Sequence, residues 1–170
     1  YEKSMKILII EDDSDIAELL EYNLTAEKWK VQIDPKGSQA FPLAVETQPD
    51  IILLDLNLPD RSGLNICKQI KNDERTWHIP IMMITAKGEE IDRVLGFELG
   101  ADDYVTKPFS PREVILRIKA VLKRNTSLDS STTQNEDNVL RFEEITLDAE
   151  KYKVTVGKDN IKLTSMEFKL

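Results

Sequence analysis

The chain has 170 residues, 41% of them hydrophobic and 32% charged, and its formal net charge at pH 7 is −8. This composition is ordinary for a protein with a sizeable core, and no apolar run approaches the roughly 18 residues that a membrane-spanning helix needs. An acidic chain without a local surplus of Lys and Arg is not expected to bind nucleic acid well. The only cysteine, Cys67, lies on the apolar face of a predicted helix, which is typical of a buried, unreactive thiol.

Strand and helix patterns alternate along residues 1–124. Strands are expected at 6–10, 30–34, 51–55, 79–85 and 104–106, and helices at about 14–24, 38–46, 64–70, 89–99 and 111–124. Ser14 or Asp15 is the expected N-cap of the first helix, and Gly100 is the expected C-cap of the fourth. Pro42 would fall inside the second helix, so we expect that helix to begin late or to be distorted. Strands that alternate with helices in this way predict an α/β fold with a doubly wound, parallel sheet.

The rest of the chain indicates a linker and the beginning of a second domain. Residues 125–138 are almost all polar, which is typical of a flexible linker. Short strand patterns at 139–142, 145–147, 153–156 and 161–163 predict a small antiparallel sheet. A capping box at 164–167 predicts a helix that has barely begun at residue 170. We therefore expect one domain at 1–124 and the truncated start of another at 139–170.

Side chains suited to phosphoryl chemistry are predicted to meet at one edge of the first sheet. Glu11 and Asp12 follow the first strand and Asp55 ends the third; in the order 2-1-3-4-5, an established order for such sheets, these two strands are neighbours. Close carboxylates repel one another unless a cation lies between them, and hard oxygen ligands suit Mg²⁺. Thr85 ends the fourth strand and Lys107 follows the fifth, which adds a hydroxyl and an ammonium group. A carboxylate nucleophile among such groups can accept a phosphoryl group, whereas the plainer interpretation is that Asp55 only opens a turn.

These residues and their spacing resemble the response-regulator receiver family of two-component systems, and the likeness covers residues 5–124. The resemblance implies that Asp55 accepts a phosphoryl group from a phosphohistidine on a partner sensor histidine kinase. It also implies that Mg²⁺ is bound directly by Asp12, Asp55 and the backbone carbonyl of Asn57, and through water by Glu11. Asp13 is the less expected ligand, because the acid pair of the family aligns with Glu11 and Asp12.

The same resemblance assigns roles to residues after the fourth and fifth strands. Lys107 would contact a phosphoryl oxygen, and the Lys107–Pro108 peptide bond would be cis. Thr85 would move toward the phosphoryl group, and Tyr104 would turn inward behind it. Such a protein is a phosphoacceptor, not an enzyme in the usual sense, although it assists its own phosphotransfer and autodephosphorylation.

The motif Gly100-Ala101-Asp102-Asp103-Tyr104 with Lys107-Pro108-Phe109 is similar to the OmpR/PhoB-like branch, in which a winged-helix DNA-binding domain follows the receiver. This branch implies a homodimer, formed on activation through the fourth helix, fifth strand and fifth helix. Its intersubunit ion pairs would be Arg93–Glu113, Asp103–Arg117 and Asp102–Arg124, although the same charges could form an ordinary solvated surface. The full-length protein would be a cytoplasmic transcription regulator without membrane contact, and DNA would bind only through the missing C-terminal part.

Three other classes of protein share parts of this pattern. A Mg²⁺-dependent aspartyl phosphatase of the haloacid-dehalogenase type needs a second aspartate two residues after the nucleophile, where this chain has Asn57. A flavodoxin-like FMN binder needs a phosphate loop after the first strand, where acids would repel a phosphate. The third alternative is a receiver-like module that dimerises without phosphorylation. One departure from the receiver pattern is the loop Arg61-Ser62-Gly63, in place of the commoner acidic or methionine-containing loop.

Overall fold

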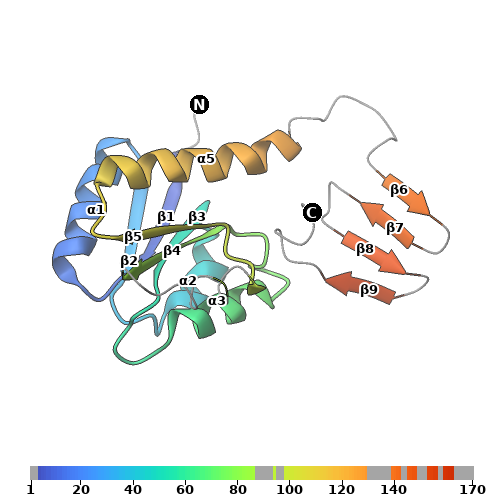
Figure 1. Cartoon of the computed structure of the whole chain (residues 1–170), viewed down its shortest axis with the longest axis horizontal. Coiled ribbons are helices and arrows are strands. Elements are labelled where there is room, and N and C mark those ends of the chain that lie inside the picture. Colours follow the sequence, from blue (N-terminus) through green and yellow to red (C-terminus); the bar gives the residue numbers. More distant parts are fainter. Residues whose placement is uncertain are drawn as a thin grey trace.

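The first part of the chain is a five-stranded parallel sheet with helices on both faces (Figure 1). The computed structural model describes residues 4–86, 94, 98–129, 139–142, 145–148, 153–156 and 159–162, with side chains described up to residue 125. The strands are β1 (Lys6–Ile10), β2 (Lys30–Asp34), β3 (Ile51–Asp55), β4 (Ile81–Ala86) and β5 (Asp103–Lys107). They pair in the order β2-β1-β3-β4-β5, as expected, so the carboxyl ends of β1 and β3 lie side by side.

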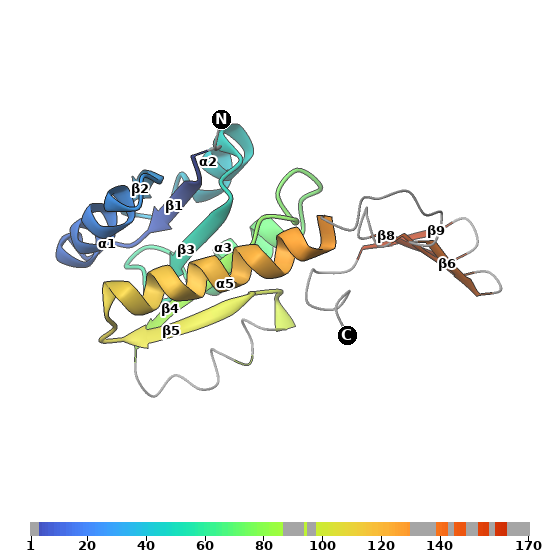
Figure 2. The same ribbon diagram turned by 90° about the horizontal axis from the view of Figure 1, so that it is seen from above.

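Helices cover the two faces of this sheet in pairs. The helices are α1 (Ser14–Ala26), α2 (Ala40–Thr47), α3 (Gly63–Lys71) and α5 (Pro111–Asp129), and most of the helix expected at 89–99 lies outside the described residues. Side chains of α2 and α3 pack with one face of the sheet, and those of α1 and α5 pack with the other. Figure 2 shows α5 running alongside β5.

The central strand β3 is buried along its whole length, because its side chains enter both cores. Ile52 and Leu54 pack toward α2 and α3, whereas Ile51 and Leu53 pack toward α1 and α5. Complete burial of one such side chain contributes about 1.5–3 kcal/mol. The four apolar residues therefore anchor the strand, and the next residue, Asp55, emerges at the edge of the sheet in a fixed place.

The first two helices begin near the expected residues, but the N-cap of the first differs from the expected one. The N-cap of α1 is Asp13, not Ser14 or Asp15: its Oδ1 accepts hydrogen bonds from the backbone N–H groups of Asp15 (3.0 Å) and Ile16 (3.2 Å). The late start expected for α2 is confirmed, since this helix begins at Ala40. Pro42 is then its third residue, where the N–H group has no acceptor within the helix and its loss is tolerated.

The remaining described residues form the end of α5 and a second sheet. Helix α5 continues to Asp129, so residues 125–129 are helical although they belong to the expected linker, and residues 130–138 lie outside the described part. A second, antiparallel sheet pairs β6 (Val139–Phe142), β7 (Ile145–Asp148), β8 (Lys153–Val156) and β9 (Asp159–Lys162) in that order. The helix expected from 164 is not among the described residues. Within the described part, no helix is long and apolar enough to cross a membrane.

Candidate functional site

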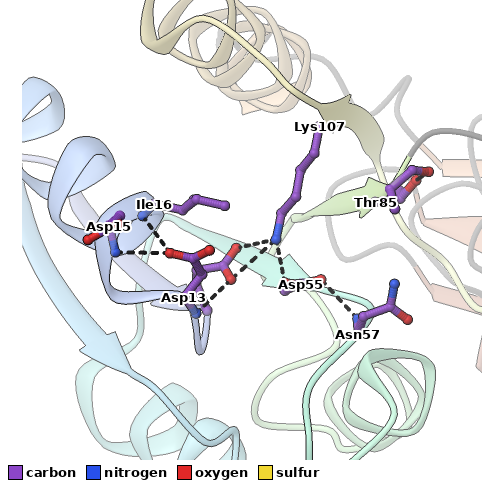
Figure 3. A network of polar contacts seen from close by, with 9 residues as sticks. Asp13, Asp15, Ile16, Asp55, Asn57, Thr85 and Lys107 are labelled. Carbon is purple, nitrogen blue, oxygen red and sulfur yellow. Dashed lines mark hydrogen bonds and ion pairs between the residues drawn. The ribbon is translucent and has the colours of Figure 1, made fainter.

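Three charged side chains from three strands meet at the carboxyl edge of the parallel sheet. Glu11 directly follows β1, Asp55 is the last residue of β3, and Lys107 is the last residue of β5. The Lys107 ammonium Nζ lies 2.7 Å from Oδ2 of Asp55 and 3.0 Å from Oε2 of Glu11. Figure 3 shows Lys107 pointing across the sheet edge to Asp55. The lysine thus neutralises part of the negative charge that β1 and β3 bring together.

An acid cluster lies beside this ion pair. Carboxylate oxygens of Glu11, Asp12 and Asp55 all lie within 4.8 Å of one another; Glu11 and Asp55 are buried, and Asp12 is exposed. Oε1 of Glu11 accepts hydrogen bonds from the backbone N–H of Asp13 (3.1 Å) and from Nζ of Lys107 (3.3 Å), whereas its buried Oε2 lies 3.0 Å from the same ammonium without hydrogen-bond geometry. An oxygen-only ligand set with one solvent-facing acid fits a hard divalent cation such as Mg²⁺.

Burial and neighbouring charges shift the pKa values of Glu11 and Lys107. Burial raises the pKa of Glu11 to about 7, and its contact with Asp55 adds to the increase, whereas Lys107 acts in the opposite direction. For Lys107, burial acts to lower the pKa, but the hydrogen bonds and charges of Asp55 and Glu11 outweigh it, and the pKa is raised. Lys107 is therefore a cation at neutral pH.

Asp55 is held through both of its carboxylate oxygens. Oδ2 accepts the hydrogen bond from Lys107, and Oδ1 accepts one from the backbone N–H of Asn57 (2.9 Å). The two donors, Lys107 and the Asn57 backbone, fix the rotamer of the Asp55 side chain (Figure 3). Asp55 is almost inaccessible to solvent, with 3% of its surface exposed. A phosphoryl group added to Asp55 would therefore lie next to the Lys107 ammonium and the acid cluster, which are already in place.

Gly63 lies in the loop at which the sequence departs from the receiver pattern, and it allows α3 to start close to the backbone of Asp55. A Cβ atom at this position would collide with the backbone oxygen of Asp55 and would lie 2.7 Å from the Cα of Leu56. The Gly63 N–H group donates to the Leu56 carbonyl (3.0 Å), and a β-bridge joins Asn57 to Ser62. The close approach of α3 to the end of β3 is thus possible only with glycine.

Asp13 has a different role from the neighbouring acids. Its side chain caps α1, and its backbone N–H group donates to Glu11, so it supports the acid cluster from the side. Sequence reasoning did not identify this cap, because Asp13, Ser14 and Asp15 are all good N-cap residues. In the structure Asp13 is the cap because it directly precedes Ser14, the first helical residue.

Thr85 and Tyr104, the two expected switch residues, are both buried. The hydroxyl Oγ1 of Thr85 donates to the Ala86 carbonyl (2.9 Å), and its side chain lies apart from the contact between Lys107 and Asp55 (Figure 3). Tyr104 is 4% exposed and packs in the core that contains α3. The Lys107–Pro108 peptide bond is cis, as the resemblance implied.

Cys67 is excluded as a nucleophile by its surroundings. It is fully buried, and this burial raises the pKa of its thiol to about 12. A thiol that stays protonated at neutral pH is unreactive. Cys67 therefore takes no part in nucleophilic chemistry at neutral pH.

Four of the six charged residues expected at a dimer face, Asp103, Glu113, Arg117 and Arg124, lie on β5 and α5. Arg117 contacts Glu113 (3.0 Å) and Asp103 (3.3 Å) within the same chain. These three residues line a shallow hollow that also includes Leu116 and Arg124. Arg93 lies outside the described residues. Asp102 differs from the other members of the expected set, because its side chain is 6% exposed and lies 3.4 Å from Nζ of the buried Lys71.

Comparisons with known proteins agree with this geometry. The response regulator receiver domain family matches residues 7–119, and the chain belongs to this family. A proposed response regulator from Chloroflexus aurantiacus is 36% identical, with 72% of this chain and 100% of that chain covered and a TM-score of 0.68. Receiver domains accept a phosphoryl group on an aspartate and typically interact with a sensor histidine kinase.

Two further solved structures bear on the metal and on the second sheet. The receiver domain of a Pseudomonas aeruginosa sensor histidine kinase is 27% identical over 71% of this chain and 99% of that chain (TM-score 0.66), and that structure contains a magnesium ion coordinated in the active site cleft. The OmpR/PhoB homolog DrrB of Thermotoga maritima is 29% identical, with 98% of this chain and 70% of that chain covered (TM-score 0.63).

Proposed function

We propose that Asp55 is the residue of this receiver domain that accepts the phosphoryl group. The observation that carries the proposal is the pair of hydrogen bonds to its carboxylate, from Lys107 and from the backbone of Asn57, at the edge of an acid cluster. In the reaction an Asp55 oxygen attacks phosphorus, the P–O bond forms, and the P–N bond to the phosphohistidine of the kinase breaks. The imidazole leaves with the electron pair of that bond and takes up a proton.

Asp12, Asp55 and the backbone carbonyl of Asn57 would hold Mg²⁺ directly, and Glu11 would contact it through water. The close approach of the three carboxylates, whose oxygens all lie within 4.8 Å of one another, supports this ligand set. When bound, the ion neutralises negative charge on the transferred phosphoryl group. Lys107 then holds one phosphoryl oxygen with its ammonium group, which lies 2.7 Å from Asp55 before the reaction.

The phosphorylated state would be read out by Thr85 and Tyr104. Thr85 lies at the end of β4, next to β5, and its hydroxyl now contacts only a neighbouring carbonyl among the described residues. We infer that it exchanges this contact for a phosphoryl oxygen and that Tyr104 occupies the space behind it. A new interaction made only in the phosphorylated state is what shifts such an equilibrium.

Output would come from dimerisation on the surface formed by the segment before Gly100, β5 and α5. Ion pairs from Arg93 to Glu113 and from Asp103 to Arg117 would set its register, and the 59% exposed Leu116 would supply apolar contact. The sheet β6–β9 would open a winged-helix domain, as supported by the match of nearly the whole chain to DrrB. DNA binding, in the cytoplasm, would then be a property of the complete winged-helix domain.

Intact-mass measurement after incubation with acetyl phosphate and Mg²⁺ tests the proposed phosphoacceptor. The unaltered chain should gain one phosphoryl group, and Asp55→Asn should gain none. Asp13→Asn is the matched control, because it changes a nearby acid that caps α1, and it should be labelled like the unaltered chain. Labelling of Asp55→Asn would assign the chemistry to another residue, and absence of labelling in all three chains would favour a module that works without phosphorylation.

A further inference from the structure

The carboxyl end of β2, beside that of β1, carries a buried aspartate that the proposed ligand set does not use. Asp34 is the last residue of β2 and is 4% exposed. It pairs in register with Ile10, the residue before Glu11. A carboxylate loses its hydration on burial and is tolerated there only when hydrogen-bond donors or an opposite charge compensate for the loss. The contacts of Asp34 therefore show which part of the chain it stabilises.

Asp34 binds the backbone of the turn between β2 and α2. Its Oδ1 accepts hydrogen bonds from the N–H groups of Lys36 (3.2 Å) and Gly37 (3.1 Å), and its Oδ2 accepts one from the N–H group of Gln39 (2.8 Å). Hydrogen bonds to a charged acceptor are stronger than those between neutral groups. Three of them fix the path of the turn, which includes Gly37 at φ +69°, a conformation that favours glycine.

The same turn packs against the loop that follows the phosphoacceptor. A Cβ atom on Gly37 would lie 2.9 Å from Cδ1 of Leu58 and 2.6 Å from Cδ1 of Ile66, so the backbone of the turn directly contacts both side chains. Leu58 is 8% exposed, and it follows Asn57, whose N–H group donates to Oδ1 of Asp55 (2.9 Å). Because protein interiors are close-packed, a shift of the turn would displace this loop.

We propose that Asp34 is a positioning residue for the phosphoryl site. It acts through the contact between Gly37 and Leu58. This contact keeps the Asn57 N–H group on Asp55 and keeps the Asn57 carbonyl in place as a proposed Mg²⁺ ligand. The inference rests on the proposed function for its effect on Mg²⁺ and phosphorylation, whereas its effect on the Asn57 N–H group requires neither.

Amide hydrogen exchange of the full 170-residue chain without Mg²⁺ tests the positioning role. Asp34→Ala should speed exchange of the Asn57 N–H group by roughly 2–30-fold relative to that of Ile52, the range expected for coupling through packed side chains. The Ile52 N–H group is a suitable reference, because it donates to the Pro80 carbonyl at the other end of β3. Asp34→Asn keeps one acceptor oxygen in place, so its effect should be smaller. Equal changes at the two N–H groups would indicate a general loss of stability and would overturn the proposal.

Asp50→Ala is the matched control, because Oδ2 of Asp50 accepts a hydrogen bond from the Lys6 N–H group (2.8 Å) at the opposite edge of the sheet. Both Asp34→Ala and Asp50→Ala should lower the urea midpoint, since each removes a carboxylate that binds backbone N–H groups. Only Asp34→Ala should also weaken Mg²⁺ binding in calorimetric titration, by roughly 2–30-fold. If the Mg²⁺ affinities of the two variants are equal, Asp34 has only a structural role and the proposal fails.

Leu58→Ala tests the route from the turn to the loop. In this background Asp34→Ala should change Asn57 exchange by less than about twofold, because the contact through which Asp34 acts has been removed. The full effect of Asp34→Ala in the same background would overturn the route. If Asp34→Ala does not fold, Asp34→Asn replaces it in each comparison.

The failures of the two proposals are distinguishable. An unaltered chain that binds no Mg²⁺ and takes up no phosphoryl group would contradict the proposed function. The exchange measurements would then decide the role of Asp34 by themselves, because they require neither the metal nor the phosphoryl group.

Discussion

At the scale of single residues, three adjacent acids after β1 have three different functions. Glu11 is buried between Lys107 and the other carboxylates, Asp12 faces solvent at the acid cluster, and Asp13 caps α1. The sequence predicts the cluster because strands 1 and 3 must end side by side in this fold. The sequence does not show which of the three acids takes which position. All three side chains are carboxylates, and only the path of the backbone decides where each one points.

Substitution of Asp12 and Asp13 separates metal binding from capping. Asp12→Ala should weaken Mg²⁺ binding by removing a direct ligand, with little change in the urea midpoint. Asp13→Ala should leave Mg²⁺ affinity nearly unchanged and should lower the free energy of unfolding by about 0.5–2 kcal/mol, the usual effect of losing an N-cap. Calorimetric titration with Mg²⁺ and urea unfolding measure the two effects. Equal losses of Mg²⁺ affinity in the two variants would show that the acids are misassigned.

Lys107 stabilises the buried acids before any metal or phosphoryl group is present. Lys107→Met should therefore lower the free energy of unfolding in the absence of Mg²⁺, by about 1–3 kcal/mol for the loss of a partly buried charged hydrogen-bond donor. Added Mg²⁺ should restore more stability to this variant than it adds to the unaltered chain, because the ion replaces a missing cation. Urea unfolding with and without Mg²⁺ measures both quantities; equal stabilisation of the two chains by Mg²⁺ would contradict this role.

At the scale of elements, the sequence predicts the strands better than the contacts between them. The apolar run at 51–54 specifies β3, because a strand buried on both faces needs large side chains at every position. The requirement for glycine at position 63 arises where α3 passes the end of β3, and the partner of Lys71 is Asp102, which is distant in the sequence. Neither contact leaves a periodic pattern in the sequence.

Gly63→Ala tests the close packing between α3 and β3. The added methyl group would overlap the backbone at Asp55 and Leu56, and overpacking of this kind costs about 1–3 kcal/mol. The same displacement should slow phosphorylation, since it moves the loop that carries Asn57. Ser62→Ala is the control, because Ser62 is exposed and its side chain makes no capping hydrogen bond. Urea unfolding and the rate of labelling by acetyl phosphate give the two readouts; a fully stable, normally labelled Gly63→Ala chain would refute the packing argument.

At the scale of the whole molecule, the site and the proposed dimer face are joined by β5. Its last residue, Lys107, contacts Asp55; its first, Asp103, contacts Arg117 on α5; and Tyr104 lies buried between them along the strand. A change at the acid cluster can thus reach the outer surface through one short element. The sequence predicted this strand one residue too short at each end (104–106), and the contact of Asp102 with the buried Lys71 became evident only from the structure.

The central claim, that phosphorylation of Asp55 drives dimerisation, is tested most directly by sedimentation of the chain with and without beryllofluoride and Mg²⁺. Coupling between such sites is typically 1–3 kcal/mol, so activation should raise dimer affinity by roughly 5–150-fold. The same treatment of Asp55→Asn should leave its dimer affinity unchanged, because the phosphoryl analogue has no carboxylate to bind. An unaltered chain that stays equally monomeric after treatment, or an Asp55→Asn chain that dimerises as strongly, would contradict the claim.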